Sequence, residues 1–441
     1  MIQTIKNAWK IEELRKKILF TVFALLIFRL GSAVPVPFVD TQALGTYLDS
    51  MSGTIFGLMN AMSGGSFSTA TVFALSIQPY INSSIIIQLL TVAIPALERL
   101  QKDGGEEGRK KIAAITRYTT VGIALLQGFG YYTLIKANGL LDLGDMNGVW
   151  AGVVIVASFV AGSAFIMWLG EQITEFGIGN GISIILFAGI LSRVPSMILT
   201  LYTGISNNIN GVTGDNVFNL PWWGAILIVI GMLAIVVLIV FITNAERRIP
   251  VQYAKRVVGR KMYGGQSSHI PMKVNMSGVM PIIFAQAIAS LPATIGAFVP
   301  SAQVEGSGWN TFLKIFDTGS IFYIVVYFLL ILGFSYFYAT MQFNPVEVAN
   351  NLKKNGGFIP GFRPGKPTAD FIHKVLNKIT LFGAIYLAII AIAPIITGNI
   401  IGVSSLAIGG TSIIIVVGVA LETTKAMEAQ MLMRHYKGFL E

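Results

Sequence analysis

Ten apolar stretches, separated by polar segments, follow one another along the chain. Each is about 20 residues long, which is the length that a helix needs to cross the hydrocarbon core of a bilayer. The pattern therefore predicts an all-α protein with ten membrane spans, at residues 18–38, 71–95, 113–135, 150–172, 182–203, 222–243, 279–299, 319–342, 379–397 and 400–421.

The second stretch, TVFALSIQPYINSSIIIQLLTVAIP at 71–95, differs from the others because polar residues and a proline interrupt it: Gln78, Pro79, Asn82, Ser83, Ser84 and Gln88. Lipid offers these polar groups no partners, so part of the helix surface should face protein or a water-filled path. Ile77, Ile81 and Ile85 recur every four residues and form one apolar stripe. Such a helix is suited to lining and sealing a pore. The same residues also fit a core-packing helix whose Ser and Asn join its neighbours.

Residues 52–69, SGTIFGLMNAMSGGSFST, precede this stretch and are too polar and too rich in glycine to lie in lipid. Their apolar members favour a short helix that folds back into the protein: Ile55, Phe56, Leu58, Met59 and Met62. Re-entrant backbone is tolerated where it lines a cavity or is buried in protein. The segment is therefore interpreted as a movable plug, and the alternative is an ordinary helix in an outer loop.

Basic residues are distributed unevenly between the spans. Of the 31 Lys and Arg, 26 lie in the segments 1–17, 97–112, 245–277, 343–378 and in the tail that follows the last span. In a ten-span chain all of these segments fall on one side, and the positive-inside rule places that side in the cytoplasm. Both termini are therefore expected there, although the short turn at 173–181 on the same side carries no basic residue.

The composition excludes several kinds of chemistry. Apolar residues make up 54% of the chain and charged residues 12%, as in integral membrane proteins. Without cysteine there is no disulfide or thiolate, and the three histidines lie far apart in hydrophilic segments, so no metal centre is expected. There is no GxxxxGK[ST] motif, and GIGNG at 177–181 follows an expected membrane helix, so it indicates a tight turn between spans. The net charge of +10 reflects topology more than nucleic-acid binding.

The cytoplasmic segments 245–277 and 343–378 combine basic residues with aromatic residues, glycine and proline. Proline and glycine favour ordered turns over a solvated tail. Such loops are suited to docking on ribosomal RNA phosphates or on an acidic, mobile protein. The simpler alternative is that their charges only enforce topology.

Five segments together resemble the bacterial SecY family: SGGSFSTATVFALSIQPYINSSIIIQLL (63–90), WLGEQITEFGIGNGISIILFAGI (168–190), YAKRVVGRKMYGGQSSHIPMKVNMSGVMP (253–281), NPVEVANNLKKNGGFIPGFRPG (344–365) and GGTSIIIVVGV (409–419). They follow the family's order, and the resemblance extends over essentially the whole chain. It implies two inverted five-helix halves, 1–203 and 204–441, around a central hourglass pore. An odd number of spans in each half agrees with such an inversion.

The function that the resemblance implies is a protein-conducting channel. It would translocate unfolded secretory preproteins across the bacterial plasma membrane and release transmembrane segments sideways into lipid. No enzymatic activity and no cofactor are implied, and no sequence-specific nucleic-acid binding is expected. The implied partners are SecE, SecG, the SecA ATPase, the ribosome, and the signal sequences of preproteins.

The same resemblance implies roles for individual residues. The pore ring would consist of Ile77, Ile81, Ile182, Leu186, Ile283 and Ile415. The lateral gate, between the second and third spans on one side and the seventh and eighth on the other, would have polar contacts at Asn82, Gln127 and Gln286. Docking of the motor and the ribosome would use Arg248, Arg260, Lys261 and Arg363.

Two other classes of protein remain open on the residues alone. A secondary transporter for a small neutral solute also fits ten spans and an inverted repeat. However, no Asp or Glu lies in the middle of a span, where coupled transporters place their relays. A scaffold for membrane insertion without a pore is the third possibility.

Overall fold

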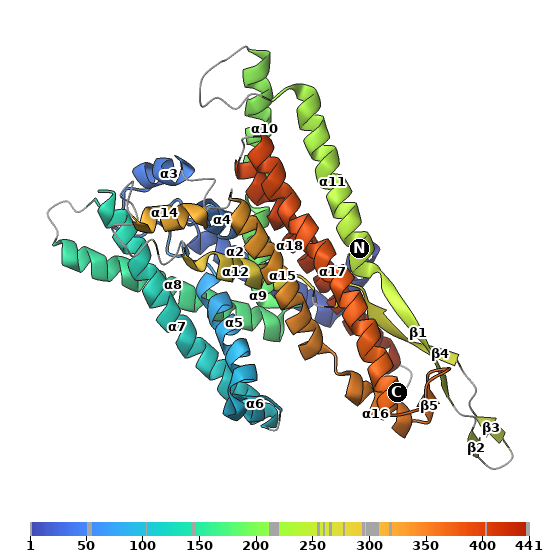
Figure 1. Ribbon diagram of the computed structural model, residues 1–441. Coiled ribbons are helices and arrows are strands. Elements are labelled where there is room, and N and C mark those ends of the chain that lie inside the picture. Colours follow the sequence, from blue (N-terminus) through green and yellow to red (C-terminus); the bar gives the residue numbers. More distant parts are fainter. Residues whose placement is uncertain are drawn as a thin grey trace.

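Long helices make up most of the computed structural model (Figure 1). The residues that the structure describes are 2–50, 55–102, 104–142, 147–210, 220–253, 256–258, 261–263, 267–276, 278–292, 296, 308–316, 320–401 and 404–437. Within 1–210 the helices are α1 Ile2–Lys10, α2 Glu12–Gly31, α3 Thr41–Ser50, α4 Ile55–Met62, α5 Gln78–Ala93, α6 Pro95–Lys102, α7 Gly105–Ala137, α8 Gly148–Phe176, α9 Gly181–Leu191 and α10 Val194–Ile209.

The remainder of the chain contains both helices and short strands. Its helices are α11 Trp222–Asn244, α12 Met280–Ala289, α14 Gly308–Ile315, α15 Ile321–Gln342, α16 Pro345–Lys354, α17 Lys366–Ile401 and α18 Ser404–Lys437. Its strands are β1 Glu246–Tyr253, β2 Arg256–Val258, β3 Lys261–Tyr263, β4 Ser267–Lys273 and β5 Gly357–Phe358.

Among the described residues, five helical stretches are long and apolar enough to cross a membrane without a break. They are α8, α9 with α10, α11, α15 with α16, and α17. The bent pair of α5 and α6 adds a sixth if it is counted as one span. The expected class, a helical protein with several membrane spans, is confirmed, whereas the number of ten spans stays a prediction.

The first two expected spans differ from the helices at their ends. Helix α2 ends at Gly31 and α5 begins at Gln78, so residues 32–38 and 71–77 are not helical. These two segments pair instead, since the Val36 amide donates to the Ala70 carbonyl and the Val72 amide to the Val34 carbonyl, both at 2.9 Å. Proline at positions 35 and 37 favours this extended backbone over a continued helix.

The expected second span also bends at its cytoplasmic end. Ile94 has extended backbone angles, φ −108° and ψ 111°, and Pro95 follows it at the start of α6. The axes of α5 and α6 differ by 105°. A residue that precedes proline avoids the helical region, which explains why α5 ends there.

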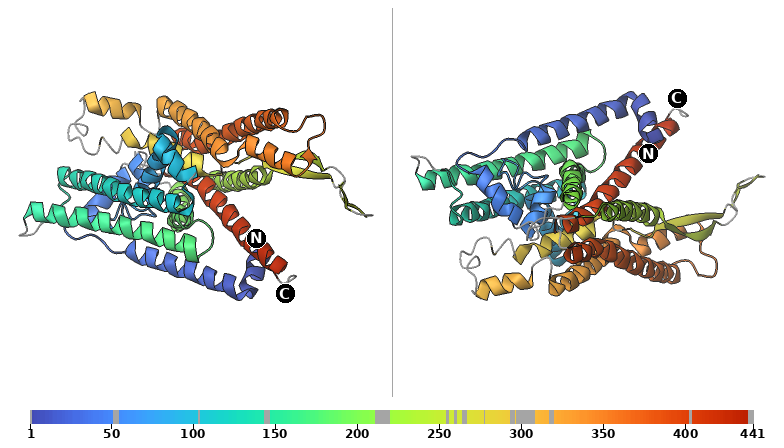
Figure 2. Two further views of the ribbon diagram at one scale, coloured as in Figure 1. Left: turned by 90° about the horizontal axis from the view of Figure 1, so that it is seen from below. Right: turned by 90° about the horizontal axis from the view of Figure 1, so that it is seen from above.

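Four groups of buried apolar side chains hold the described helices together, and the smallest joins Ala8 and Leu14 to Ile178 and Met427. The largest, called the central cluster below, draws on both halves of the sequence, from Ala24 to Val419. A second cluster lies within 36–159 and a third within 249–379. Figure 2 agrees with this division: elements coloured blue to green lie on one side, those coloured yellow to orange on the other, and the red α18 runs between them.

The two expected cytoplasmic loops form a structure that the sequence analysis did not predict. Strand β1 pairs antiparallel with both β4 and β5, which gives a three-stranded sheet in the order β4-β1-β5. A second antiparallel pair, β2-β3, extends from it at the lower right of Figure 1. Because β5 belongs to the segment 343–378, the two loops are joined, and a small amount of sheet accompanies the helical fold.

Candidate functional site

The six residues expected in the pore ring lie in the central cluster. Ile77, at the start of α5, and Ile415, in α18, are each 1% exposed, and Ile81, Leu186 and Ile283 are also buried members. Ile182 packs against them and is partly buried. The structure thus brings together side chains from α5, α9, α12 and α18 that are up to 338 positions apart.

Two of these side chains lie beside Gly170 of α8. A Cβ atom placed on Gly170 would lie 3.5 Å from Cγ1 of Ile182 and 3.6 Å from Cδ1 of Ile77. Both isoleucines therefore rest on the same small patch of α8.

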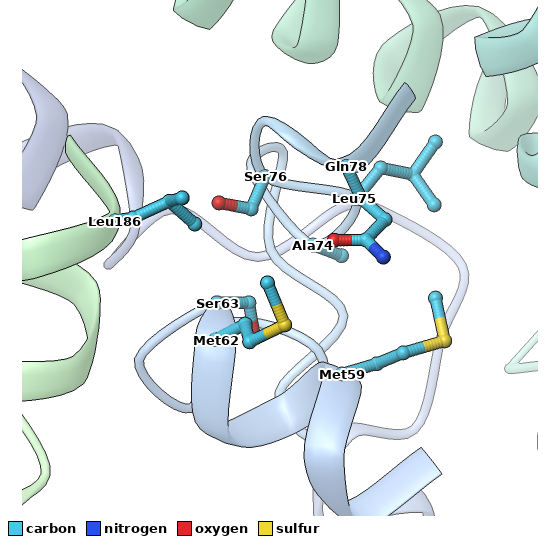
Figure 3. Close-up of a pocket in the computed structure, with 8 residues that line it drawn as sticks. All are labelled: Met59, Met62, Ser63, Ala74, Leu75, Ser76, Gln78 and Leu186. Atoms are coloured by element: carbon cyan, nitrogen blue, oxygen red, sulfur yellow. The ribbon is translucent and has the colours of Figure 1, made fainter. Parts of the chain in front are cut away.

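The segment interpreted as a plug contains the short helix α4, Ile55–Met62. Residues 51–54 and the side chains of Ile55, Phe56 and Leu58 lie outside the described part of the structure. Met59 and Met62 of α4 line a small pocket together with Leu186 of the expected ring (Figure 3). Figure 3 shows Gln78 and Ser76, which precede or begin α5, on another wall of the pocket. The helix α4 therefore packs directly against the expected ring.

The end of the plug segment fits tightly against α9. A Cβ atom on Gly189 would lie 2.6 Å from the carbonyl oxygen of Met62, and Gly64 has a positive φ of 69°. The hydroxyl of Ser192 donates to the carbonyl of Gly64 at 3.5 Å. Glycine at 189 and 64 permits a backbone approach that a side chain would prevent.

The irregular end of the plug segment, which follows α4, is fixed by hydrogen bonds. The Asn60 side-chain oxygen accepts from the Ser68 amide at 3.0 Å, and the Ser63 hydroxyl accepts from the Phe67 amide at 3.1 Å. The Tyr131 hydroxyl of α7 donates to the Phe67 carbonyl, and the two rings stack with centroids 4.3 Å apart. These contacts join the stretch to the first half of the chain and position the start of α5.

The polar second span packs on two sides, and its role in lining a pore stays a prediction. Ile77, Ile81 and Ile85 all point into the central cluster. On the other side, the Ser83 hydroxyl donates to the Thr116 carbonyl of α7 at 2.8 Å, which is the interhelical role expected of a core-packing helix. One face of α5 thus contributes to the apolar cluster while another attaches the helix to α7.

The three residues expected at the lateral gate are all buried. Asn82 lies on α5, Gln127 on α7 and Gln286 on α12, and α5 contacts both of the other helices. The side-chain oxygens of Gln127 and Gln286 have no hydrogen-bond partner among the described residues. Their role as contacts across a gate stays a prediction.

A contact between the two halves that sequence reasoning missed joins Tyr338 of α15 to Gln88 of α5. The Tyr338 hydroxyl donates to the Gln88 side-chain oxygen at 2.7 Å. Gln88 stood out in the sequence as a polar residue in an apolar stretch. Its partner could not be identified in the same way, because tyrosine is common in apolar helices near the membrane surface.

The expected docking residues lie on or beside the sheet, as far as they are described. Arg248 is on β1 and contacts the Glu246 carboxylate at 2.7 Å, and Arg363 is exposed in the turn before α17. Lys261 begins β3, whereas Arg260 lies outside the described residues. The sheet and α16 and α17 share the third apolar cluster, so Arg248 and Arg363 belong to one folded unit.

The buried interior of the described structure contains polar side chains, but no carboxylate, Lys, Arg or His side chain. Its buried polar residues are Asn, Gln, Ser and Thr, without Asp, Glu, Lys, Arg or His. No cluster of potential metal ligands occurs among the described residues. A proton or sodium relay of buried carboxylates, as in a coupled transporter, therefore has no candidate in this part of the chain.

Comparison with known proteins gives a family. The model of the SecY family matches residues 71–424. Protein translocase subunit SecY from Streptomyces coelicolor is 43% identical over 452 residues, and that from Bacillus licheniformis is 44% identical over 445 residues. Both alignments cover 100% of this chain and 100% of the relative.

Solved structures show the same fold. A structure described as that of a protein conducting channel superposes with a TM-score of 0.64 at 17% identity. One that concerns the plug domain of the SecY protein gives 0.62 at 16%, and Sec61 in the canine ribosome-channel complex gives 0.60 at 16%. Each match covers 95% of this chain and 92% of the other.

Proposed function

This chain belongs to the SecY family, and we propose that it is the channel-forming subunit of a protein translocase. It is a multi-pass membrane protein. In the proposed activity it conducts unfolded secretory preproteins outward across the bacterial plasma membrane and releases transmembrane segments sideways into lipid. Both termini lie in the cytoplasm, as the distribution of basic residues indicates.

The observation that carries the proposal is the composition of the central cluster. Its members at the expected ring come from α5 and α9 in the half 1–203 and from α12 and α18 in the half 204–441. A purely apolar constriction expels water and so excludes ions. Flexible aliphatic side chains yield to an extended polypeptide and close again behind it, because no specific bond has to break.

Two neighbouring features complete the channel. The α4 helix, packed against Leu186, acts as a plug that adds a second barrier on the outer side of the ring. The lateral gate lies where α5 and α7 face α12 and α15, and α5 contacts α12 in the closed arrangement. Opening there lets an apolar segment leave the pore for lipid without passing through water.

Partner proteins supply the energy for transport and hold the two halves of the channel together. The chain carries no nucleotide-binding motif, so the SecA ATPase or a translating ribosome supplies the push. We assign the docking surface to the exposed face of the sheet and the turn that holds Arg363. SecE clamps the two halves and SecG is peripheral. Support for the ribosome comes from the structural similarity to Sec61 in a ribosome-channel complex.

The test uses the absence of native cysteine. One cysteine replaces Ile81, another is placed in the mature part of a precursor stalled in transit, and disulfide formation is measured. The matched control is Val153→Cys, on the exposed surface of α8. We expect a disulfide with Ile81→Cys and none with the control. If a folded Ile81→Cys protein forms none while the precursor is stalled, the proposal is wrong and a solute transporter becomes the better explanation.

A further inference from the structure

The hydrogen bond between Tyr338 and Gln88 joins two helices that are distant in the sequence. The two residues are 250 positions apart, and the hydroxyl oxygen lies 2.7 Å from the amide oxygen. Helix α5 belongs to the half 1–203 and α15 to the half 204–441. The bond therefore crosses between the two halves and has to break when they separate at this point.

Tyr338 is held firmly by aromatic contacts within the second half. The Tyr338 ring lies 5.1 Å from the ring of Phe284 on α12 and 5.9 Å from that of Phe337, and Phe284 also contacts Phe334 at 5.9 Å between centroids. Aromatic pairs at these distances attract each other. The aromatic cluster thus fixes the ring and directs its hydroxyl toward α5.

Gln88 is held by a second hydrogen bond within the first half. The Gln88 side-chain nitrogen donates to the Ser84 hydroxyl, one turn earlier on α5, at 3.3 Å. The amide therefore uses its oxygen for Tyr338 and its nitrogen for Ser84. Because both ends of the amide are engaged, the oxygen is oriented toward Tyr338 before any contact with a substrate.

The position along the helices places this bond on the cytoplasmic side of the constriction. Gln88 follows Ile81 by seven residues, and at 1.5 Å per residue this is about 10 Å nearer the end of α5 that leads into the basic segment 97–112. Tyr338 lies about one turn before α15 ends at Gln342. An incoming signal sequence reaches this level of the gate before it reaches the ring.

We propose that Tyr338 and Gln88 form a latch that holds the cytoplasmic part of the lateral gate closed and sets how apolar a signal sequence must be to open it; this rests on the function proposed above. An apolar helix that enters between α5 and α15 separates the pair and offers neither a donor nor an acceptor in return. Only a sufficiently apolar helix offsets that loss by packing. Hydrogen bonds between membrane helices of this strength change an open-to-closed ratio by about three-fold to about twenty-fold.

The chain provides well-matched variants. Tyr338→Phe and Gln88→Leu each remove one end of the latch and keep most of the packing. The control is Tyr327→Phe on the same helix: Tyr327 is buried, and its hydroxyl has no hydrogen-bond partner among the described residues. Tyr327→Phe therefore removes a tyrosine hydroxyl without removing a hydrogen bond. The double variant Tyr338→Phe/Gln88→Leu completes the cycle.

The first measurement does not depend on transport. Spin labels at Leu89→Cys on α5 and Met341→Cys on α15, two exposed positions beside the latch, report the distance between the helices in the protein reconstituted with its partner subunits. We expect Tyr338→Phe, Gln88→Leu and the double variant to raise the separated population equally, by about three-fold to about twenty-fold. Tyr327→Phe should match the parent. An unchanged distribution in Tyr338→Phe, or an equal change in Tyr327→Phe, overturns the latch.

The second measurement is transport of precursors with intact and with weakened signal sequences. We expect Tyr338→Phe and Gln88→Leu to raise transport of the weakened precursor and to leave that of the intact precursor nearly unchanged. Equal rejection of the weakened precursor by the parent and by Tyr338→Phe overturns the role in selection. If the parent transports no precursor at all, the proposed function fails, whereas the distance measurement still decides whether the latch exists.

Discussion

Single residues of the expected ring contribute only apolar surface to the constriction. We expect Ile81→Asn and Ile283→Asn to let water and ions through, because an amide holds water where an aliphatic chain expels it. The measurement is ion flux across vesicles that contain the protein and its partners, together with transport of precursors with defective signal sequences. Val153→Asn, on the exposed surface of α8, is the control. A solute transporter would only lose uptake in the ring variants, and a scaffold without a pore would change little.

Gly189 permits the close approach of the expected plug to α9. Gly189→Val places its Cβ where the Met62 carbonyl oxygen lies only 2.6 Å away, so the plug has to shift. We expect an ion leak and a loss of about 1–3 kcal/mol in the free energy of unfolding. Gly122→Ala is the control, because a Cβ there meets nothing within 4 Å and should add up to about 1 kcal/mol of stability. Unchanged leak and stability in Gly189→Val would show that the plug does not rest on α9.

The sequence predicts which side chains of the expected ring come together better than it predicts the close contacts around them. The four-residue spacing of Ile77, Ile81 and Ile85 and the resemblance were sufficient to choose side chains that the structure brings into one cluster. The spacing could not reveal that α5 starts only at Gln78, since residues 71–77 look equally apolar. Pro79, in the first turn of α5, is the one local signal for this start. The pairing of the preceding residues with residues 34–36 is a tertiary contact that the sequence does not indicate.

At the scale of elements, the sheet was only partly visible in the sequence. In β1, buried Ile249 and Val251 alternate with exposed Arg248 and Pro250, which is the period of a strand. The partner strand β5 has only two residues and follows about a hundred positions later, so no local pattern indicates it. The basic residues of both loops point to docking, whereas nothing in their sequence indicates that the backbones of the two loops pair.

The docking surface gives a prediction at this scale. Arg363→Ala removes an exposed charge. The Arg363 backbone carbonyl accepts a hydrogen bond from the Thr368 hydroxyl at 2.8 Å, and the substitution leaves this bond in place. We expect weaker binding of the SecA ATPase, most clearly at low salt, with less than about 0.5 kcal/mol change in the free energy of unfolding. Affinity measured against ionic strength is the readout. The control is Lys136→Ala, which is exposed at the end of α7 on the expected outer side and should bind SecA with the parent's affinity. Equal affinity in the parent, Arg363→Ala and Lys136→Ala would contradict the assignment.

For the whole molecule, the two ends of the chain provide independent support for the topology. The Thr4 hydroxyl of α1 donates to the Glu428 carboxylate of α18 at 3.1 Å, and Lys17 donates to the Gln430 side chain at 3.4 Å. Helix α1 therefore lies against the C-terminal part of α18. Termini that meet on one side of a membrane require an even number of spans, which agrees with ten.

The exposed tryptophans lie near both expected surfaces of the membrane. All six tryptophan side chains are between 45% and 64% exposed, so none of them belongs to the buried core. Trp150, Trp222 and Trp309 lie at the first turns of α8, α11 and α14, on the expected outer side, whereas Trp9 lies on α1 at the expected cytoplasmic side. Tryptophan prefers the membrane–water interface, so these residues indicate where both surfaces of the bilayer meet the protein.

The orientation itself can be measured with single cysteines in intact cells and a maleimide that does not cross membranes. We expect Thr46→Cys on α3 and Asn208→Cys on α10 to react from outside, since both positions are exposed and lie in segments that carry few basic residues. Lys353→Cys on α16 is equally exposed and should react only after the membrane is opened. Reaction of Lys353→Cys in intact cells would place the sheet and its docking surface outside, where neither a motor nor a ribosome can reach them. Protection of Asn208→Cys would instead mean that a span before α10 has been miscounted.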